Sequence, residues 1–131
     1  MRALRPSTAV PAIAPAPVGH EILEEPASFD GLLVVARGEL DIASAFSLRD
    51  KLHGAAASGV QRILLDLSDV TFMDSLSMAA VVATQRRLGD EGRMAVVATH
   101  PYVLLIFEAG GIDSVVDVFR TRDAAEDHLR A

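Results

Sequence analysis

Residues Val70 to Val82 read VTFMDSLSMAAVV, and this stretch decides how the chain folds. A run of residues typical of a β-strand stops at Asp74, and an apolar run typical of a helix follows at once. Asp and Ser are preferred at helix N-caps because their oxygens accept hydrogen bonds from free N–H groups of the first turn. The stretch therefore predicts a strand that leads directly into a helix over about residues 75–88.

Strands and helices are expected to alternate along the rest of the chain. Nearly continuous apolar runs, as in strands buried on both faces, occupy residues 31–40 (GLLVVARGEL), 62–67 (RILLDL) and 93–99 (RMAVVAT). Shorter strands are expected at residues 20–25 (HEILEE), at an edge, and 115–119 (VVDVF). Further helices are expected at residues 42–58 after an Asp41 cap, from Pro101 to the Gly110-Gly111 stop, and at residues 123–130. The alternation predicts an α/β fold with a largely parallel sheet.

Composition limits the classes of function that the chain can have. Its 131 residues, 50% of them hydrophobic, suffice for one domain with its own core. Because the chain has no cysteine, thiol chemistry and cysteine-based zinc sites are excluded. The formal net charge is −6, and no basic stripe of the kind that binds nucleic acid stands out. The histidines, at positions 20, 53, 100 and 128, are too scattered to predict a metal site.

The first nineteen residues differ in composition from the rest. MRALRPSTAVPAIAPAPVG holds four of the six prolines and lacks the uninterrupted apolar run of a secretory signal. We expect residues 1–19 to form a flexible Ala/Pro-rich tail and residues 20–131 to form the folded domain. No stretch approaches the roughly 18 to 20 consecutive apolar residues that a membrane span needs, so we expect a cytoplasmic protein without membrane contact.

The junction residues Asp74 and Ser75 allow two interpretations. In the first they only cap the helix, which is worth roughly 0.5–2 kcal/mol. In the second the helix N-terminus, with its partial positive charge and free N–H groups, accommodates an anion. A phosphoserine there would bring about −1.5 to −2 charges next to Asp74, so attraction and repulsion would compete in a switch. Local chemistry leaves both interpretations open.

The helix after the junction is unusually apolar. From Leu76 to Ala83 a helical wheel leaves almost no polar sector. A helix on a sheet normally keeps a polar outer face, and one that is apolar all round is usually covered on both sides. Either another element of the domain or a partner protein is therefore expected to cover it.

The helix after residue 100 carries a second apolar feature. Val103, Ile106 and Phe107 are expected to form its buried stripe at helical spacing. Leu104 and Leu105 then point away from the core, where helices usually show charge. They are either incidentally exposed or form a contact for self-association or for a partner.

Three segments together resemble the STAS domain family, and within it the bacterial anti-sigma-factor antagonists. RGELDIASA (37–45) resembles the Gly-Glu-Leu-Asp turn that follows a long strand in the family, and RILLDLSDVTFMDS (62–75) resembles its strand, loop and Asp-Ser junction. GRMAVVATHPYVLLIFEAGGID (92–113) resembles the next strand, the Pro-led helix and its Gly stop. The match covers about residues 20–130. It implies a STAS fold, which is a four- to five-stranded mixed sheet with an antiparallel edge strand, flanked by several helices.

The resemblance also implies a mechanism called partner switching. The unphosphorylated antagonist binds an anti-sigma factor, which is also a serine kinase, and thereby frees a sigma factor. The kinase then uses ATP to phosphorylate the antagonist, which dissociates, and a phosphatase resets it. In this scheme the antagonist is a substrate and a binding protein. We therefore expect no catalytic residue, no metal and no cofactor.

The sequence departs from the family at the phosphate acceptor. The family pattern is Asp-Ser-Ser/Thr-Gly, with the phosphate on the third residue, whereas this chain has Asp74-Ser75-Leu76-Ser77. Leu76 has no hydroxyl, so Ser75 and Ser77 become the candidate phosphorylation sites. Alternatively, the protein is a permanently active antagonist, or a STAS module with a non-sigma role such as small-ligand sensing or scaffolding.

The expected docking surface for the anti-sigma partner follows from the strand ends and the apolar helix. In parallel sheets functional groups gather where the strands end, and two predicted strands end at acidic residues. The predicted partner-binding residues are Asp41, Asp74, Ser75, Ser77, Met78 and Val82.

A phosphoaspartate receiver is a rival α/β interpretation, because Asp66 ends a predicted strand. Receivers carry an acidic pair near the first strand and a late lysine. Here the segment GLLVVARGEL lacks the acidic pair, and no lysine follows residue 51. The chain also lacks the Gly-rich nucleotide loops and the Gly-x-Ser-x-Gly elbow of hydrolases. A binding protein is therefore favoured over an enzyme.

Overall fold

The computed structural model describes residues 19–131, so the predicted tail of residues 1–19 lies, apart from Gly19, outside the described residues. The strands are β1 (His20–Glu25), β2 (Leu32–Leu40), β3 (Arg62–Met73), β4 (Arg93–Val97) and β5 (Asp117–Phe119). The helices are α1 (Ile42–Ala57), α2 (Ser75–Leu88), α3 (Pro101–Ala109) and α4 (Arg122–Arg130), with a 3-10 turn η1 (Ile112–Ser114).

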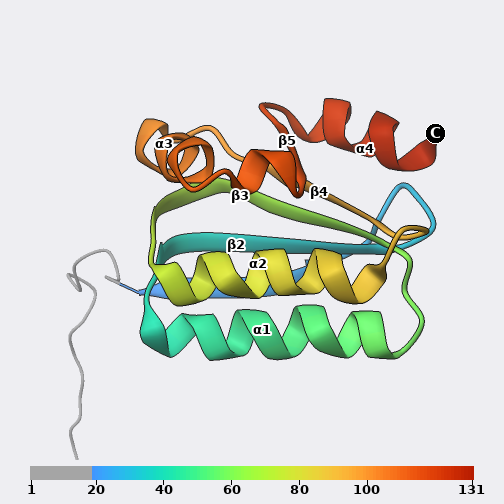
Figure 1. The fold of residues 1–131 in the computed structure, drawn as a ribbon, viewed down its shortest axis with the longest axis horizontal. Coiled ribbons are helices and arrows are strands. Elements are labelled where there is room, and N and C mark those ends of the chain that lie inside the picture. Colours follow the sequence, from blue (N-terminus) through green and yellow to red (C-terminus); the bar gives the residue numbers. More distant parts are fainter. Residues whose placement is uncertain (1–18) are drawn as a thin grey trace, which may run out of the picture.

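The strands form one sheet in the spatial order β1-β2-β3-β4-β5. β1 is an antiparallel edge strand, and the other neighbours are parallel. Figure 1 shows α1 and α2 side by side against one face of the sheet and α4 on the opposite side, with α3 beside β3. This five-stranded mixed sheet flanked by helices confirms the fold that the family resemblance implies.

Apolar side chains fill both faces of the central strands. The larger cluster joins β2, β3 and β4 to α1, α2 and α3, and a smaller cluster lies between the sheet and α4. Neighbours in the chain, such as Leu64 and Leu65 of β3, are both fully buried and belong to different clusters. The near-continuous apolar runs of these strands are explained by this burial on both faces.

Strand β3 joins two stretches that the sequence analysis treated separately, residues 62–67 and the β-type run that stops at Asp74, because it continues from Arg62 to Met73. Shifts in its register with β2, after Val35 and after Gly38, keep the two strands paired to their ends. Gly38 has a φ of 92°, and a Cβ atom there would lie 2.1 Å from the carbonyl oxygen of Gly19. Such bulges depend on the neighbouring strand, so the sequence alone did not show that the two stretches form one strand.

Helix α2 is covered mainly by its own domain. Met78 and Val81 face the core, and Ala80 and Thr84 are also buried. Helix α1 packs along its side, so another element of the domain covers most of the apolar surface of α2. A narrow outer stripe stays accessible, since Ala79 is exposed and Leu76 is 46% exposed.

Helix α3 packs against the extension of β3 that reaches beyond the end of β4. Val103 and Phe107 enter the core as predicted, and the rings of Phe72 and Tyr102 stack at a centroid distance of 5.9 Å. Residues of α3 and of α2 line a common groove beside this contact. Of the helices described, none combines the length and apolar character that a membrane crossing requires.

Candidate functional site

The site begins where β2 and β3 end side by side, with Leu40 paired to Met73. The next residue in each strand is an aspartate that caps the following helix. The Oδ1 atom of Asp74 accepts the N–H of Ser77 at 2.8 Å, and the Oδ1 atom of Asp41 accepts the N–H of Ser44 at 3.2 Å. Both aspartates are therefore N-caps, and the start of each helix lies at the carboxyl edge of the sheet.

Ser77 and Met78 lie inside the molecule, not on the surface where the sequence placed them. Ser77 is 0% exposed, and its hydroxyl donates to the carbonyl oxygen of Leu40 at 3.3 Å. Met78 is 5% exposed and belongs to the core. The reason is geometric, because residues three and four positions after the Asp74 cap turn back toward the sheet. A kinase would have to open this junction to reach Ser77.

Ser75 and Leu76 occupy the first turn of α2 and are exposed. Helix geometry leaves the first N–H groups of this turn without intrahelical partners, and the Asp74 carboxylate satisfies that of Ser77. Partial positive charge therefore gathers near Ser75, next to the negative Asp74. Leu76, at the family's acceptor position, presents an apolar side chain where a hydroxyl would be.

An apolar groove of about 760 Å³ runs between α2 and α3, and we call it the α2–α3 groove. Four predicted residues line it, namely Asp74, Ser75, Met78 and Val82. Its other main lining residues, which the sequence analysis missed, are Phe72, Tyr102, Ile106, Ile112 and Arg86. These come from β3, α3, η1 and the far end of α2, so their proximity depends on tertiary packing. The apolar residues of α3 were the signal in the sequence that could have indicated them.

Asp41 lies outside the α2–α3 groove, and so does Ser77. Asp41 is exposed at the head of α1. The structure therefore brings together four of the six predicted partner-binding residues, places Asp41 next to them at the same sheet edge, and buries Ser77 beneath them.

Asp66, which prompted the receiver comparison, is engaged in a structural network. It is 3% exposed, and its Oδ2 atom accepts hydrogen bonds from Arg122 Nε at 2.9 Å and pairs with Nη2 at 2.8 Å. Its Oδ1 atom accepts the N–H and hydroxyl of Ser68 at 2.9 and 2.7 Å. Burial alone would raise the pKa of Asp66, but the hydrogen bonds from Ser68 and Arg122 outweigh it and hold the pKa below its ordinary value.

Leu104 and Leu105 differ in their surroundings. Leu105 is 58% exposed, as predicted, whereas Leu104 is partly buried against the core. Both line a hollow of about 660 Å³ between α3 and β5, together with Glu108, Asp113 and Asp117.

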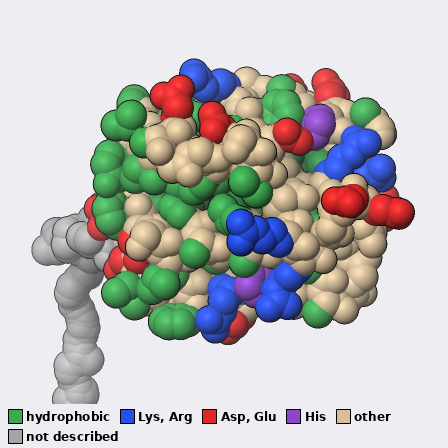
Figure 2. All heavy atoms as spheres, in the orientation of Figure 1, with side chains coloured by type: hydrophobic (Ala, Val, Ile, Leu, Met, Phe, Trp, Pro, Cys, Tyr) green, Lys and Arg blue, Asp and Glu red, His purple; other side chains and the backbone are tan. Residues whose placement is uncertain are grey.

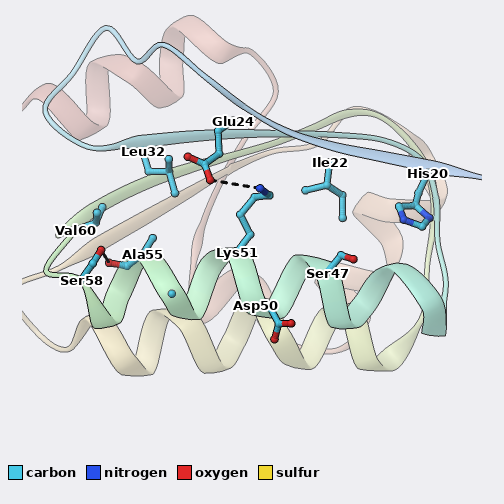
Figure 3. Close-up of a pocket in the computed structure, with 11 residues that line it drawn as sticks. His20, Ile22, Glu24, Leu32, Ser47, Asp50, Lys51, Ala55, Ser58 and Val60 are labelled. Carbon is cyan, nitrogen blue, oxygen red and sulfur yellow. Dashed lines mark hydrogen bonds and ion pairs between the residues drawn. The ribbon is translucent and has the colours of Figure 1, made fainter.

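The hollow between β1 and α1 is polar and crossed by an ion pair. Lys51 Nζ lies 3.4 Å from a carboxylate oxygen of Glu24, and Figure 3 shows this pair spanning the space between the strand and the helix. The volume is about 820 Å³, and none of the predicted site residues lines it. Within residues 19–131, no group of three or more His, Asp or Glu side chains is placed to hold a metal ion.

Comparison with known proteins agrees with this architecture. The STAS domain matches residues 23–125. BtrV of Bordetella bronchiseptica is 28% identical over 98 residues, which cover 73% of this chain and 84% of BtrV. The anti-sigma-F factor antagonist RsfB of Mycobacterium tuberculosis is 26% identical over 96 residues, covering 72% of this chain and 79% of RsfB.

A solved structure shows the same arrangement of elements. The crystal structure of an anti-sigma factor antagonist from Mycobacterium paratuberculosis matches with a TM-score of 0.81 and 28% identity, over 88% of this chain and 98% of the other. The family match spans most of the chain. The chain therefore belongs to the STAS domain family, and its relatives include proteins named as anti-sigma factor antagonists.

Proposed function

We propose that this protein is an anti-sigma-factor antagonist of the partner-switching type. It binds an anti-sigma factor that is also a serine kinase, and this binding frees a sigma factor in the cytoplasm. It acts as a binding protein and a potential kinase substrate, not as a catalyst, and it contacts neither nucleic acid nor membrane directly. The observation that carries the proposal is the α2–α3 groove, which opens beside the Asp74–Ser75 junction.

The groove is suited to an apolar segment of a protein partner. Phe72, Tyr102 and Ile106 form one wall, and Met78 and Val82 form the other. Removing such surface from water yields roughly 25 cal/mol per Å². The polar junction at one end of the groove and Arg86 near the other end would fix the orientation of the bound segment.

The switch in this chain differs from that of the family. Leu76 cannot accept a phosphate, and Ser77 is buried with its hydroxyl bonded to Leu40. Ser75 is exposed at the first turn, so it is the hydroxyl that a kinase would reach. We infer that the chain binds its partner either permanently or under the control of Ser75.

Leu76 also favours a second candidate function. A STAS module without an acceptor hydroxyl would suit a role outside sigma control, as a small-ligand sensor or as a scaffold in a larger complex. In that case the same groove would bind a molecule other than an anti-sigma kinase. The two functions therefore differ in the molecule that binds in the groove: an anti-sigma kinase in the first, and another ligand or protein in the second.

Capture from the native cell distinguishes the two functions. The bait is the wild-type chain, and the groove variant is Val82→Lys, because a charge in a desolvated contact is costly. The matched control is Val115→Lys, at an exposed valine outside the groove. We expect the wild type and Val115→Lys to retain an ATP-binding serine kinase and Val82→Lys to lose it. If none of the three retains such a kinase, the antagonist function is wrong and the non-sigma role replaces it.

A further inference from the structure

The outer side of α1 and α2 holds a second apolar hollow, separate from the main opening of the α2–α3 groove. Its volume is about 190 Å³, and we call it the α1–α2 hollow. Phe46, which is 49% exposed, and Leu76 lie at its rim, and Ala79 and Ala83 are the small residues that leave the space between them. A hollow of this size accepts one side chain of about the size of leucine.

Positive charge surrounds this hollow. Arg49 and His53 line it, and the guanidinium of Arg49 lies 5.0 Å from the centroid of the Phe46 ring. Arg87 lies one turn after Ala83 on α2, on the same side of the helix as the hollow that Ala83 lines. Burial lowers the pKa of His53, and the neighbouring charges of Arg87 and Arg49 lower it further. Figure 2 shows Lys and Arg side chains on either side of a histidine on this face.

The arginines around the hollow are only weakly neutralised. Arg49 pairs with the exposed Asp50 at 3.3 Å, and within residues 19–131 no carboxylate lies within ion-pair distance of Arg87. A positive patch around an apolar hollow is unexpected in a chain with a net charge of −6. Its natural counterpart is an apolar side chain flanked by carboxylates.

Helix α3 of the same chain presents such a counterpart. Leu105 is 58% exposed, at the rim of the hollow between α3 and β5. Glu108, one turn further along, and Asp113 and Asp117 line the same hollow. Arg120 also lines that hollow, but the carboxylates outnumber it. We call the exposed apolar and acidic surface of Leu105, Glu108 and Asp113 the α3 knob.

We propose that this protein associates head to tail, with the α3 knob of one copy seated in the α1–α2 hollow of the next. Leu105 fills the apolar hollow, and Glu108 and Asp113 face Arg49 and Arg87. Apolar burial supplies the attraction, and the complementary charges set the orientation. A second copy is the occupant because the apolar side chain and the matching charges are both present on this chain.

The contact is heterologous, because the knob and the hollow are different surfaces. A head-to-tail assembly keeps one unused knob at one end and one unused hollow at the other, so it grows with concentration unless a ring closes. Ala79 and Ala83 line both the α1–α2 hollow and the α2–α3 groove. If the proposed function holds, a second copy and an anti-sigma partner compete for the outer side of α2, whereas the self-association itself does not depend on that function.

Sedimentation velocity on the full chain tests the contact. The wild type is expected to show a weight-average mass that rises with protein concentration and falls with added salt, since salt screens the charge pairs. Leu105→Glu removes the knob, and the double variant Arg49→Glu/Arg87→Glu reverses the charge of the hollow. All three positions are exposed, so both variants should fold, and circular dichroism checks this. Each variant alone should associate about tenfold more weakly or worse.

Mixing the two variants gives the decisive measurement. The Leu105→Glu chain keeps an intact hollow, and the double variant keeps an intact knob, so the mixture should form a one-to-one dimer that cannot grow. The control is Glu91→Arg, a charge reversal at an exposed residue away from both surfaces, and it should associate like the wild type. A monomeric wild type at all concentrations, or a mixture that stays monomeric, would overturn the proposal.

Discussion

The hydroxyl of Ser77 donates a hydrogen bond to the carbonyl oxygen of Leu40 at 3.3 Å, which joins the first turn of α2 to the end of β2. The N–H of Asp74 donates to the same oxygen at 3.0 Å. Because Ser77 is fully buried, its hydroxyl stabilises the junction between β2 and α2. The exposed Ser75, two residues earlier, is the hydroxyl that another protein can reach.

Acidic substitutions should separate these two serines. Ser77→Asp would bury a carboxylate next to a carbonyl oxygen, and we expect it to lower the free energy of unfolding by about 3 kcal/mol or more. Ser75→Asp, exposed at a helix N-terminus, should change it by about 0.5 kcal/mol or less. Urea unfolding followed by circular dichroism measures both. Equal destabilisation by the two substitutions would contradict the burial of Ser77.

Restoring the family's acceptor should restore the switch. We expect the wild type to bind its anti-sigma partner with or without ATP, and Leu76→Ser to be released by ATP. The new phosphate would be held at the helix N-terminus, and its roughly two negative charges would oppose docking. Intact-mass spectrometry measures the phosphate on each variant. Binding assays with the captured kinase, in the presence and absence of ATP, measure its release.

Leu76→Ala is the matched control for that experiment. It removes the same apolar surface without adding a hydroxyl, so ATP should not release it. Stoichiometric phosphate on Ser75 or Ser77 of the wild type, with loss of binding, would instead show that the switch has moved along the chain.

The Asp66–Arg122 pair should make stability depend on pH in acid. The pKa of Asp66 is below its ordinary value in the folded protein, so the unfolded chain binds more protons between the folded pKa and about 3.9. Stability from this group is therefore complete above about pH 4 to 5 and is lost as the pH falls through the folded pKa. Asp66→Asn should lower the free energy of unfolding by about 1–3 kcal/mol at neutral pH, a moderate loss because Arg122 is partly exposed. It should also weaken the fall in stability at acid pH, which we call the acid limb of the stability curve.

The exposed Asp50 provides the comparison for this prediction. It also pairs with an arginine, Arg49, but at the surface, where the pair is worth about 0–1 kcal/mol. Asp50→Asn should leave the acid limb of the stability curve as it is in the wild type. Thermal unfolding of the three proteins between pH 3 and about 7 is the measurement, the pH range being chosen to span the carboxylate pKa values. An acid limb unchanged in Asp66→Asn would mean that other carboxylates control it.

Removal of residues 1–18 should leave the stability of the domain nearly unchanged. These residues are rich in proline and alanine and offer little apolar surface to offset the entropy of ordering. A chain that starts at Gly19 keeps the carbonyl that accepts the N–H of Glu39 at 3.1 Å. We expect its melting temperature to stay within a few degrees of that of the full chain. A large decrease in thermal scanning would show that the tail packs on the domain.

Sequence reasoning succeeded where the controlling interactions are local. The caps Asp41 and Asp74 bond to N–H groups three residues away, so their roles could be inferred from the order of residues alone. The apolar periodicity of α1, α2 and α3 likewise indicated each helix within a few residues of its observed ends. The absence of a hydroxyl at Leu76 is a property of the sequence that no folding can change.

Tertiary structure decided the features that join distant segments. The burial of Ser77 depends on the end of β2, 37 positions away in sequence, and the α2–α3 groove depends on Phe72 stacking on Tyr102. The two β-type stretches before Asp74 form the single strand β3 because bulges keep β2 and β3 paired along their length. Exposure is a property of packing between elements, so a single sequence could propose which residues act, while the fold determined which of them a partner can touch.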